Sequence, residues 1–394
     1  MGYNRPLLRR FPCHPRCNAL SVCLAMAILS GPAAALAGQG PSSGPAPSQQ
    51  HDMGQPAGAA QDYPTLHIAG FGDVDYSQTK QPEGPRGFSL GQFVLHMTSE
   101  LSPRVTFFGE LSFTARSDAG TGTPPAAGFN AEIERMILRF DESDRLKISF
   151  GRYHTPINWW NTAFHHGQWL QTTITRPEMI QFGGKFLPVH FVGALVEGAA
   201  PAGGWNVNYQ AGFGNGRGQV ISRAGDAGDN NGFRATLLNF FSKPDRFFGL
   251  QFGGSFYFDK ITLPDTRDFA ERIVAGHVVW QKEDPELIAE VAAVRHQQVD
   301  TALVTWSHAY YIQAAYRLPQ FDRLWKPYYR FEHIGVNPMD PVFTTVPNLN
   351  DGSTLGIRFD ASQFVALKGE FRTWRRASSQ PRNYGGFFQV CFTF

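Results

Sequence analysis

The chain has 394 residues, of which 17% are charged and 14% are aromatic, and its formal net charge is +2 at pH 7. A helical membrane protein is excluded, because no run of about 18 apolar residues occurs beyond the N-terminal region. The charge is also too close to balance for a nucleic-acid-binding protein, so we expect no nucleic-acid partner.

The first 37 residues have the order of a secretory signal peptide. Arginines at positions 5, 9, 10 and 16 precede an apolar run over residues 19–29, and Ala35-Leu36-Ala37 matches an A-x-A cleavage site. We therefore predict that residues 1–37 are removed and that the mature chain begins at Gly38.

Residues 38–63 are rich in Gly, Pro, Ser, Ala and Gln. Such a composition cannot bury enough apolar surface to fold, so we expect a flexible periplasmic leader. Three of the four cysteines lie in the predicted signal peptide, which leaves Cys391 alone in the mature chain. No internal disulfide is expected.

Residues 64–394 show hydrophobic alternation with a period of two, which is typical of strands with one apolar face. Within 247–259, Phe252 and Phe256 share one face and Gln251 and Ser255 share the other. A helix cannot separate the residues in this way. Sixteen strands are predicted, at 66–77, 88–101, 105–116, 130–141, 146–153, 186–198, 204–213, 232–242, 247–259, 271–282, 287–297, 308–317, 327–335, 352–361, 364–375 and 385–394.

The predicted connections alternate between short and long along the chain. Residues 102–104 and 201–203 are short, whereas 117–129, 154–185 and 336–351 are long. An even number of strands with short turns at one end and long loops at the other is typical of transmembrane β-barrels. A soluble β-sandwich is the alternative. Both alternatives are all-β. The signal peptide and the loop asymmetry favour the transmembrane antiparallel β-barrel, with about 16 strands, over the soluble sandwich.

The chain ends on an alternating aromatic face, with Phe388, Phe392 and Phe394. Together with the signal peptide and the strand number, this ending resembles bacterial outer-membrane porins. In that family the last phenylalanine belongs to the signal read by the barrel-assembly machinery, and the resemblance implies this role for Phe394. It also implies a place in the outer membrane of a Gram-negative bacterium, among lipid and lipopolysaccharide, and a homotrimer.

The segment Leu146-Lys147-Ile148-Ser149-Phe150-Gly151-Arg152-Tyr153-His154-Thr155-Pro156 resembles a strand and turn of the phosphate-selective porin O and P group. That group has lysine-rich binding sites, whereas this chain has eight lysines in all. From the barrel-level resemblance we expect passive diffusion of small hydrophilic solutes, and the arginines of the predicted lumen favour a weak preference for anions.

If the apolar face meets lipid, the opposite face lines a water-filled lumen. The predicted lumen cations are Arg116, Arg135, Arg139, Lys147, Arg234, Arg317, Arg330, Arg358, Lys368 and Arg372. The predicted anions are Asp73, Asp75, Glu110, Asp141, Asp259, Glu290, Glu332, Asp360 and Glu370. Many of these residues are expected to form salt bridges, and arginines suit anionic solutes.

The longest predicted loop, 154–185, is too apolar to lie in water. It contains Trp159, Trp160, His165, His166 and Trp169, and we expect it to form a constriction inside the barrel or over its mouth. A barrel plugged by this loop, acting as a substrate-specific receptor, is the alternative.

His154, His165, His166 and Glu178 match no metal-ligand spacing, so no metal or other cofactor is predicted and packed, hydrogen-bonded histidines are expected. No G-x-S-x-G motif occurs, and Ser307-His308 is only a sequence neighbour pair. We predict no enzymatic activity, with a barrel-embedded hydrolase as the remaining alternative.

Overall fold

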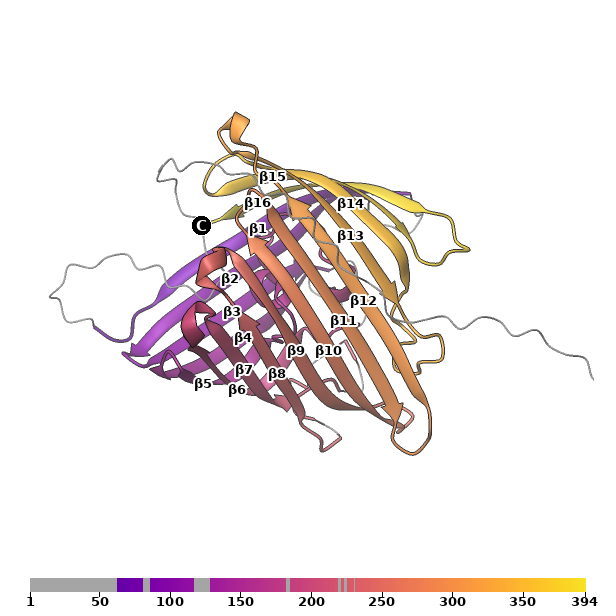
Figure 1. Cartoon of the computed structure of the whole chain (residues 1–394). Helices are drawn as coiled ribbons and strands as arrows, with labels where there is room; N and C mark the ends of the chain where they lie inside the picture. Colours follow the sequence, from indigo (N-terminus) through magenta and orange to yellow (C-terminus); the bar gives the residue numbers. More distant parts are fainter. Residues whose placement is uncertain are drawn as a thin grey trace, which may run out of the picture. The chain divides into compact units, whose positions relative to one another are not determined.

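The computed structural model describes residues 62–80, 86–116, 128–181, 185–218, 221–222, 225–229 and 231–394. These residues form sixteen antiparallel strands that close into one barrel (Figure 1). Each strand pairs with its neighbours in sequence, and β1 and β16 close the ring from Phe71 opposite Thr393 to Thr79 opposite Gly385. The predicted fold class and strand number are confirmed. The predicted signal peptide and all but two residues of the predicted leader lie outside the described residues.

The strands are β1 (His67–Thr79), β2 (Arg86–Ser102), β3 (Val105–Ala115), β4 (Phe129–Ser143), β5 (Leu146–His154), β6 (His190–Ala200), β7 (Val207–Asn215), β8 (Ala235–Ser242), β9 (Leu250–Thr262), β10 (Asp268–Gln281), β11 (Glu286–Gln298), β12 (Val304–Ala315), β13 (Trp325–Gly335), β14 (Leu349–Asp360), β15 (Val365–Arg375) and β16 (Asn383–Thr393). Closure leaves no unpaired strand edge, which satisfies the backbone along the whole ring.

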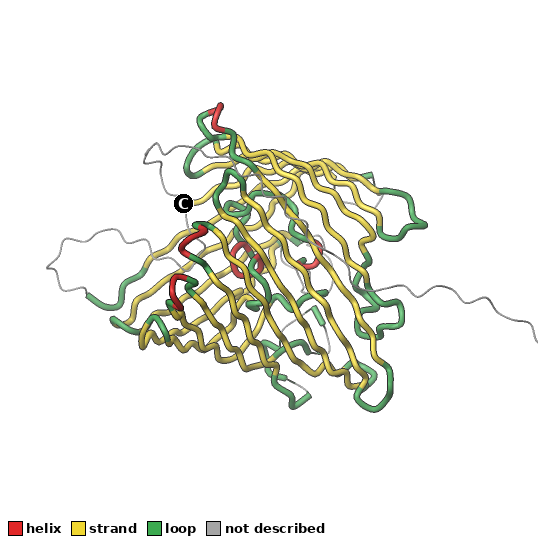
Figure 2. The backbone as a smooth tube through the Cα atoms, in the orientation of Figure 1, coloured by secondary structure: helices red, strands yellow, loops and turns green. Residues whose placement is uncertain are grey.

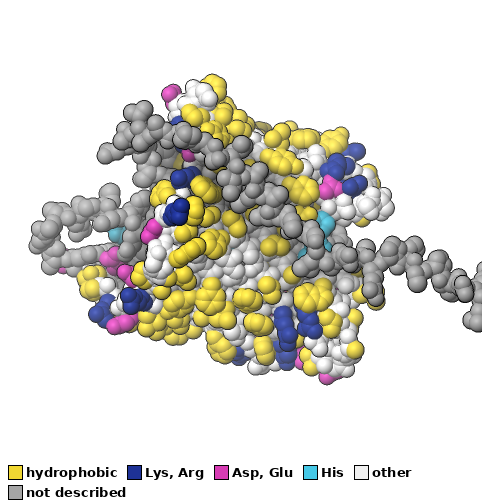
Figure 3. Space-filling view, in the orientation of Figure 1, with side chains coloured by type: hydrophobic (Ala, Val, Ile, Leu, Met, Phe, Trp, Pro, Cys, Tyr) yellow, Lys and Arg dark blue, Asp and Glu magenta, His cyan; other side chains and the backbone are white. Residues whose placement is uncertain are grey.

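The outer surface of the barrel is apolar and the inner surface is largely polar. On β9, Phe252, Phe256 and Phe258 are 37%, 41% and 40% exposed, whereas Ser255 and Asp259 are 1% and 3% exposed. In the view of Figure 3, hydrophobic side chains are spread over the wall, and charged side chains gather toward its ends. The predicted alternation therefore places the apolar side chains on the outside of the barrel and the polar side chains on the inside.

The connections alternate in length as predicted, except between β8 and β13. The β9–β10 and β11–β12 loops comprise only residues 263–267 and 299–303, because these strands continue beyond their predicted ends. Residues 316–324 form the longest connection at the short-turn end and contain the 3-10 turn η4 (Pro319–Phe321). The turns η2 (Ala202–Gly204) and η3 (Asp245–Phe247) lie in two other connections at that end.

Strand β6 begins at His190, four residues later than predicted. Phe186, Leu187 and Val189 are each less than 5% exposed and lie in a loop that packs in the interior. Their run is apolar on both parities because it is surrounded by protein on all sides. A strand with one lipid face would alternate instead.

The barrel interior contains a hydrophobic core. Side chains of the β5–β6 loop, among them Ile157, Trp160 and Met179, pack with wall residues such as Tyr257 and Phe269. Two short helical turns, α1 (Trp160–Phe164) and η1 (Glu178–Ile180), belong to this loop (Figure 2). Among the described residues, no helix is long and apolar enough to cross a bilayer.

Candidate functional site

The loop between β5 and β6 is packed inside the barrel, and we call its described residues, 155–181 and 185–189, the internal loop. Glu290 on β11 holds its first turn. Its Oε1 accepts hydrogen bonds from the backbone amides of Trp159 (2.8 Å) and Trp160 (2.7 Å), and all three residues are buried. These bonds attach the loop to a part of the wall that is distant in sequence.

The middle of the internal loop is held by β13 and β15. Glu370 accepts hydrogen bonds from the backbone amides of Ile174 (2.9 Å) and Thr175 (3.2 Å). Arg330, which is fully buried, donates to the carbonyl oxygens of Thr175 (2.9 Å) and Arg176 (3.1 Å). Buried charges of the wall thus satisfy backbone groups that would otherwise lack water inside the barrel.

Two further cations of the wall hold the same loop. Arg358 donates to the carbonyl oxygens of Trp169 (2.7 Å) and Gln171 (3.0 Å), and its guanidinium lies 5.0 Å from the centroid of the Trp169 ring. Lys368 donates to the carbonyl oxygen of Thr173 at 3.1 Å. These cations therefore serve first as attachments for the loop.

Near the end of the loop, Glu178 forms ion pairs with Arg372 (2.8 Å) and Arg376 (2.7 Å). Burial acts to raise the pKa of Glu178, but the two guanidiniums outweigh it and hold that pKa below its ordinary value. A cavity of about 380 Å³ adjoins this cluster, with Lys185 and Phe186 also in its lining. It is a gap between the loop and the wall.

The predicted lumen residues fall into three groups. Ten of them are buried inside the barrel: Asp73, Glu110, Asp259, Glu290, Arg330, Glu332, Arg358, Lys368, Glu370 and Arg372. Asp75, Arg135, Arg139, Asp141, Lys147, Arg317 and Asp360 are partly exposed, and Arg116 and Arg234 are exposed. The last two and Arg317 lie just outside strands, where alternation does not determine the direction of a side chain. Of the predicted constriction residues, Trp159, Trp160, His165 and His166 are buried and Trp169 is partly buried.

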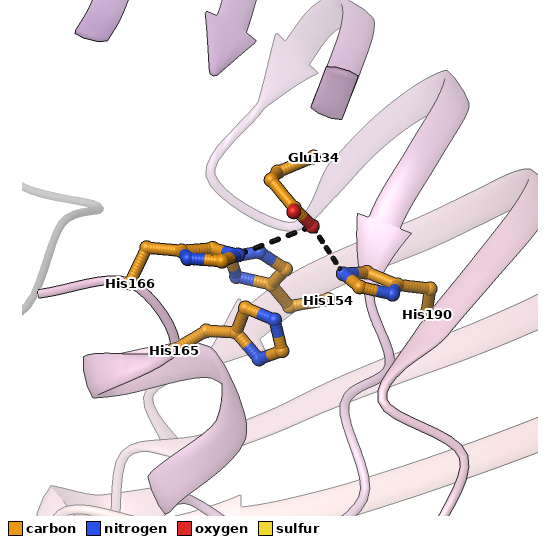
Figure 4. Close-up of side chains that lie close together, drawn as sticks. All are labelled: Glu134, His154, His165, His166 and His190. Carbon is orange, nitrogen blue, oxygen red and sulfur yellow. Dashed lines mark ion pairs between the residues drawn. The ribbon is translucent and has the colours of Figure 1, made fainter. Parts of the chain in front are cut away.

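Four histidines and a glutamate gather beside α1, and we call them the histidine cluster (Figure 4). Glu134 comes from β4, His154 from the end of β5, His165 and His166 from the residues after α1, and His190 from the start of β6. One nitrogen or carboxylate oxygen from each lies within 4.8 Å of all the others. Five potential donor atoms thus lie close together.

Glu134 is the centre of the hydrogen bonding in this cluster. Its Oε2 lies 3.1 Å from His166 Nε2 and 2.8 Å from His190 Nε2, and its Oε1 accepts a hydrogen bond from Ser112 at 2.9 Å. The rings of His165 and His166 are 4.4 Å apart between centroids, so these adjacent residues point into the same cluster. Glu178, which we considered with them in the sequence, lies apart with Arg372.

Strand register brings the cluster together. His154 and His190 are paired directly across β5 and β6, at the point where the internal loop leaves the sheet. On β4, Arg135 and Ile133 pair with consecutive residues of β3, so Glu134 is the extra residue of a β-bulge. In a regular strand, adjacent side chains point to opposite faces. Because of the bulge, Glu134 and its neighbour Arg135 both face inward.

Arg152 stabilises this bulge. Its Nη1 donates to the carbonyl oxygens of Ile133 (2.7 Å) and Glu134 (2.6 Å) and lies 3.3 Å from the Glu134 carboxylate. One residue earlier, Gly151 has φ +149°, and a Cβ there would lie 1.8 Å from the carbonyl oxygen of Met136. Glycine is therefore required where β5 passes the bulge.

Asn161 on α1 orients His165. Its side-chain nitrogen donates to the carbonyl oxygens of Thr155 (3.0 Å) and Val189 (2.9 Å), so its oxygen accepts from His165 Nδ1 at 2.7 Å. His165 Nε2 is then the nitrogen with the lone pair. Burial, with His154 close by, holds the pKa of His165 well below its ordinary value, so the ring is neutral.

Sequence reasoning missed Glu134 and His190. Glu134 lies on the parity assigned to lipid, and only the bulge turns it inward. His190 stands in an otherwise apolar run, and this polar residue was the available signal. Its partner His154 lies 36 positions earlier, so the pairing depends on how the internal loop returns to the sheet.

No family model matches the sequence, and no curated protein matches it. Several solved structures, in contrast, match the fold of the chain. The anion-selective porin of Comamonas acidovorans aligns over 84% of this chain and 100% of its own, with 12% identity and a TM-score of 0.61. The fold is that of the porins. OmpF of Salmonella typhi, in complex with daunomycin, aligns over 84% and 97% (12% identity, TM-score 0.57). The outer membrane channel DcaP of Acinetobacter baumannii also aligns over 84% and 97% (11% identity, TM-score 0.54).

Proposed function

We propose that the chain is an outer-membrane porin of a Gram-negative bacterium that passes small hydrophilic solutes by diffusion. The observation that carries this proposal is the closed sixteen-stranded ring with apolar side chains outside and polar side chains inside. A closed barrel satisfies every backbone group within the sheet, which is the condition for strands to cross a bilayer. The porin fold supports the same function.

The internal loop narrows the path through the barrel in this proposal. Its attachments to Glu290, Arg358 and Glu370, together with the contact of His166 with Gln92 on β2, fix it inside the barrel. Solutes then pass through the space that the loop leaves open. A narrow path makes local charge important, because a passing ion lies close to the wall.

We further propose a weak preference for anions. Arg139 and Lys147 are partly exposed on the inner face of β4 and β5, and Lys185 is exposed beside the cavity at Arg372. One protein with this fold is described as an anion-selective porin. Phosphate as the specific solute, suggested by the likeness of residues 146–156 to the porin O and P group, is a narrower form of the same proposal.

The expected partners follow from this setting. The apolar outer wall would contact membrane lipid and lipopolysaccharide, and the barrel-assembly machinery would insert the chain. A homotrimer is the expected assembly.

A plugged, substrate-specific barrel is the second candidate. The observation in its favour is the hydrophobic core inside the lumen, where Trp160, Met179 and Phe343 are each 2% exposed or less. A barrel-embedded hydrolase has less support, because Ser307 faces inward and is 1% exposed whereas His308 is exposed on the other face. The pair therefore cannot act together.

Planar-bilayer recording of the purified, folded protein tests the proposal. A porin gives stepwise conductance, and a salt gradient gives a reversal potential displaced toward that of the anion. A folded barrel without conductance would contradict the channel and favour the plugged barrel. A displacement toward the cation would contradict only the anion preference.

A further inference from the structure

We propose that the histidine cluster binds one divalent transition-metal ion, such as Zn²⁺, through Glu134, His154, His165, His166 and His190. Imidazole nitrogens with a single carboxylate are a donor set that zinc, nickel and copper favour, whereas magnesium and calcium favour oxygen donors. This inference is independent of conductance, because it concerns the attachment of the internal loop.

The spacing of the donors fits an ion. Donor atoms on opposite sides of a zinc ion with bonds of about 2.1 Å are about 4.2 Å apart. No two of the five donor atoms in the histidine cluster are more than 4.8 Å apart, which is close to the spacing that one ion requires.

A buried ring with unsatisfied nitrogens is the second observation. His154 is 5% exposed, and neither of its ring nitrogens has a hydrogen-bond partner among the described residues. A carboxylate oxygen of Glu110 lies 3.5 Å from its Nε2, which is too long for a good hydrogen bond. An imidazole buried in this way loses its hydration without compensation, and a metal ion would supply the missing partner.

Outer contacts prepare two of the other rings. Asn161 accepts from His165 Nδ1, which leaves the lone pair on Nε2. Gln92 Nε2 lies 3.0 Å from His166 Nδ1, and the amide oxygen of Gln92 has no hydrogen bond among the described residues. A flip of this amide places the oxygen on Nδ1–H, and His166 Nε2 then carries a lone pair toward the cluster. Such contacts are what orients histidine ligands in metal sites.

The charges around the cluster balance before an ion binds. The carboxylates of Glu134, Glu110 and Asp226 are accompanied by the guanidiniums of Arg135 and Arg152. The third guanidinium is that of Arg176, which is buried and donates to the carbonyl oxygen of His165. Arg152 is additionally occupied by two carbonyl oxygens of the bulge, so it does not need the Glu134 oxygen that faces the histidines.

A bound ion would join four segments: β4, β5, β6 and the residues after α1. It would therefore fasten the first half of the internal loop to the barrel on the side away from Glu290. The consequence is a loop held from two directions, with the ion contributing to the thermal stability of the folded barrel.

The test is metal analysis of the folded mature protein, residues 38–394, in which Cys391 is the one cysteine, purified with a tag free of histidine. After equilibration with Zn²⁺ or Mg²⁺ and dialysis, elemental analysis should find one zinc per chain and no magnesium. With Co²⁺, visible d–d bands should appear without a thiolate charge-transfer band, since Cys391 lies on β16. Zinc below one tenth per chain in the folded wild type would overturn the proposal.

Two variants locate the site. His190→Gln and Glu134→Gln should each weaken zinc binding at least tenfold. The matched control is His308→Gln, because His308 and His333 form a second histidine pair, 5.2 Å apart between ring centroids, on β12 and β13. Equal loss in the control, or full binding in both cluster variants, would contradict the assignment. Folding is verified in SDS gels, where a folded barrel migrates faster before boiling than after it. If a variant does not fold, the zinc content of the wild type alone tests the proposal.

Discussion

At the scale of single residues, the β-bulge at Glu134 changes what the lumen contains. One extra residue in β4 turns a carboxylate inward beside Arg135, and the side chain of Arg152 satisfies the carbonyl groups that the bulge leaves unpaired. Without the bulge, Glu134 would face lipid, where a charged side chain is strongly disfavoured. A local backbone irregularity thus creates the histidine cluster.

Glu178 gives a pH-dependent prediction. Its folded-state pKa is lowered because Arg372 and Arg376 outweigh burial, so its contribution to stability is present above the unfolded value of 4.5 and is lost as pH falls through the lower folded value. Glu178→Gln should therefore lower the free energy of unfolding at pH 7 by about 1.5–3 kcal/mol, the range for hydrogen bonds to charged groups. The difference from wild type should shrink below pH 4.5.

Denaturant unfolding in detergent at pH 7 and below pH 4 measures this difference. Glu142→Gln is the control, because Glu142 pairs with Arg104 at 2.9 Å on the surface with both side chains more than half exposed. Exposed pairs contribute little, so its effect should be small at either pH. A Glu178 effect that is the same at both pH values would contradict the ion-pair explanation.

Phe394 gives the second residue-scale prediction. Its backbone closes the ring through two hydrogen bonds with Gly70 (3.0 and 3.1 Å), and its ring stacks on Phe93. Phe394→Asp should reduce the amount of folded barrel in outer membranes several-fold, because it places a charge on the lipid face and removes the terminal aromatic residue. Immunoblots of unboiled membrane samples measure this amount.

Phe364→Asp is the matched control, because Phe364 is 52% exposed and Phe394 is 55% exposed, but Phe364 is not at the chain end. Equal losses in the two variants would assign the effect to lipid exposure alone and would contradict a role as an assembly signal.

At the scale of elements, the internal loop behaves as a separate layer inside the barrel. Its backbone is bound by Glu290, Arg330, Arg358 and Glu370, which come from β11, β13, β14 and β15. Buried charges that bond to backbone groups are costly to leave unpaired, so removal of one partner loosens the loop more than a surface change would.

Shortening the internal loop between Trp159 and Gln171 should raise single-channel conductance several-fold. The reason is that a barrel of this strand number is wide enough for an aqueous channel once the loop no longer occupies it. The control is a variant shortened within residues 299–303, a loop in which Asp300 and Thr301 are exposed. Its single-channel conductance is measured in the same way and should stay unchanged. Unchanged conductance in a correctly folded loop variant would exclude the constriction role.

At the scale of the whole molecule, the apolar outer wall sets the environment in which the barrel is stable. Val274, at the middle of β10, is 49% exposed and lies between Phe256 and Ala293 of the neighbouring strands. Val274→Lys should destabilise the barrel in lipid vesicles by about 2–4 kcal/mol, the cost of a lysine near the bilayer midplane. Thr301→Lys, in an exposed loop, should have almost no effect.

Denaturant titration of vesicle-embedded protein, followed by tryptophan fluorescence, measures both variants. An unchanged free energy of unfolding in Val274→Lys would mean that this face meets water and would contradict the membrane-spanning assignment.

Much of the architecture could be predicted because each strand carries its own pattern. Phe252 and Phe256 identify the outer face of β9 without any knowledge of its neighbours, and loop lengths alternate along the chain. The errors occurred where a segment has no lipid face. The sequence predicts strand from residue 186 although the apolar run there does not alternate, and the strand begins at His190. A run that is buried on all sides has no lipid face to impose a period.

The candidate site could be predicted only in part. The aromatic content of residues 159–169 indicated a packed loop, and Arg330, Arg358 and Lys368 were assigned to the inner face. Their partners could not be read from the sequence, because backbone carbonyl groups of a loop more than 150 positions away leave no pattern.

Alternation and loop lengths, both local in the sequence, thus determined the class of fold, the strand number and the two faces of the wall. Only the tertiary structure decided where the internal loop runs and which inward side chains meet. The physical reason is that a bulge shifts parity by one residue, as at Glu134, and that His154 and His190 become neighbours only when the barrel pairs their strands. Contacts between distant segments depend on register and closure, and these are properties of the whole ring.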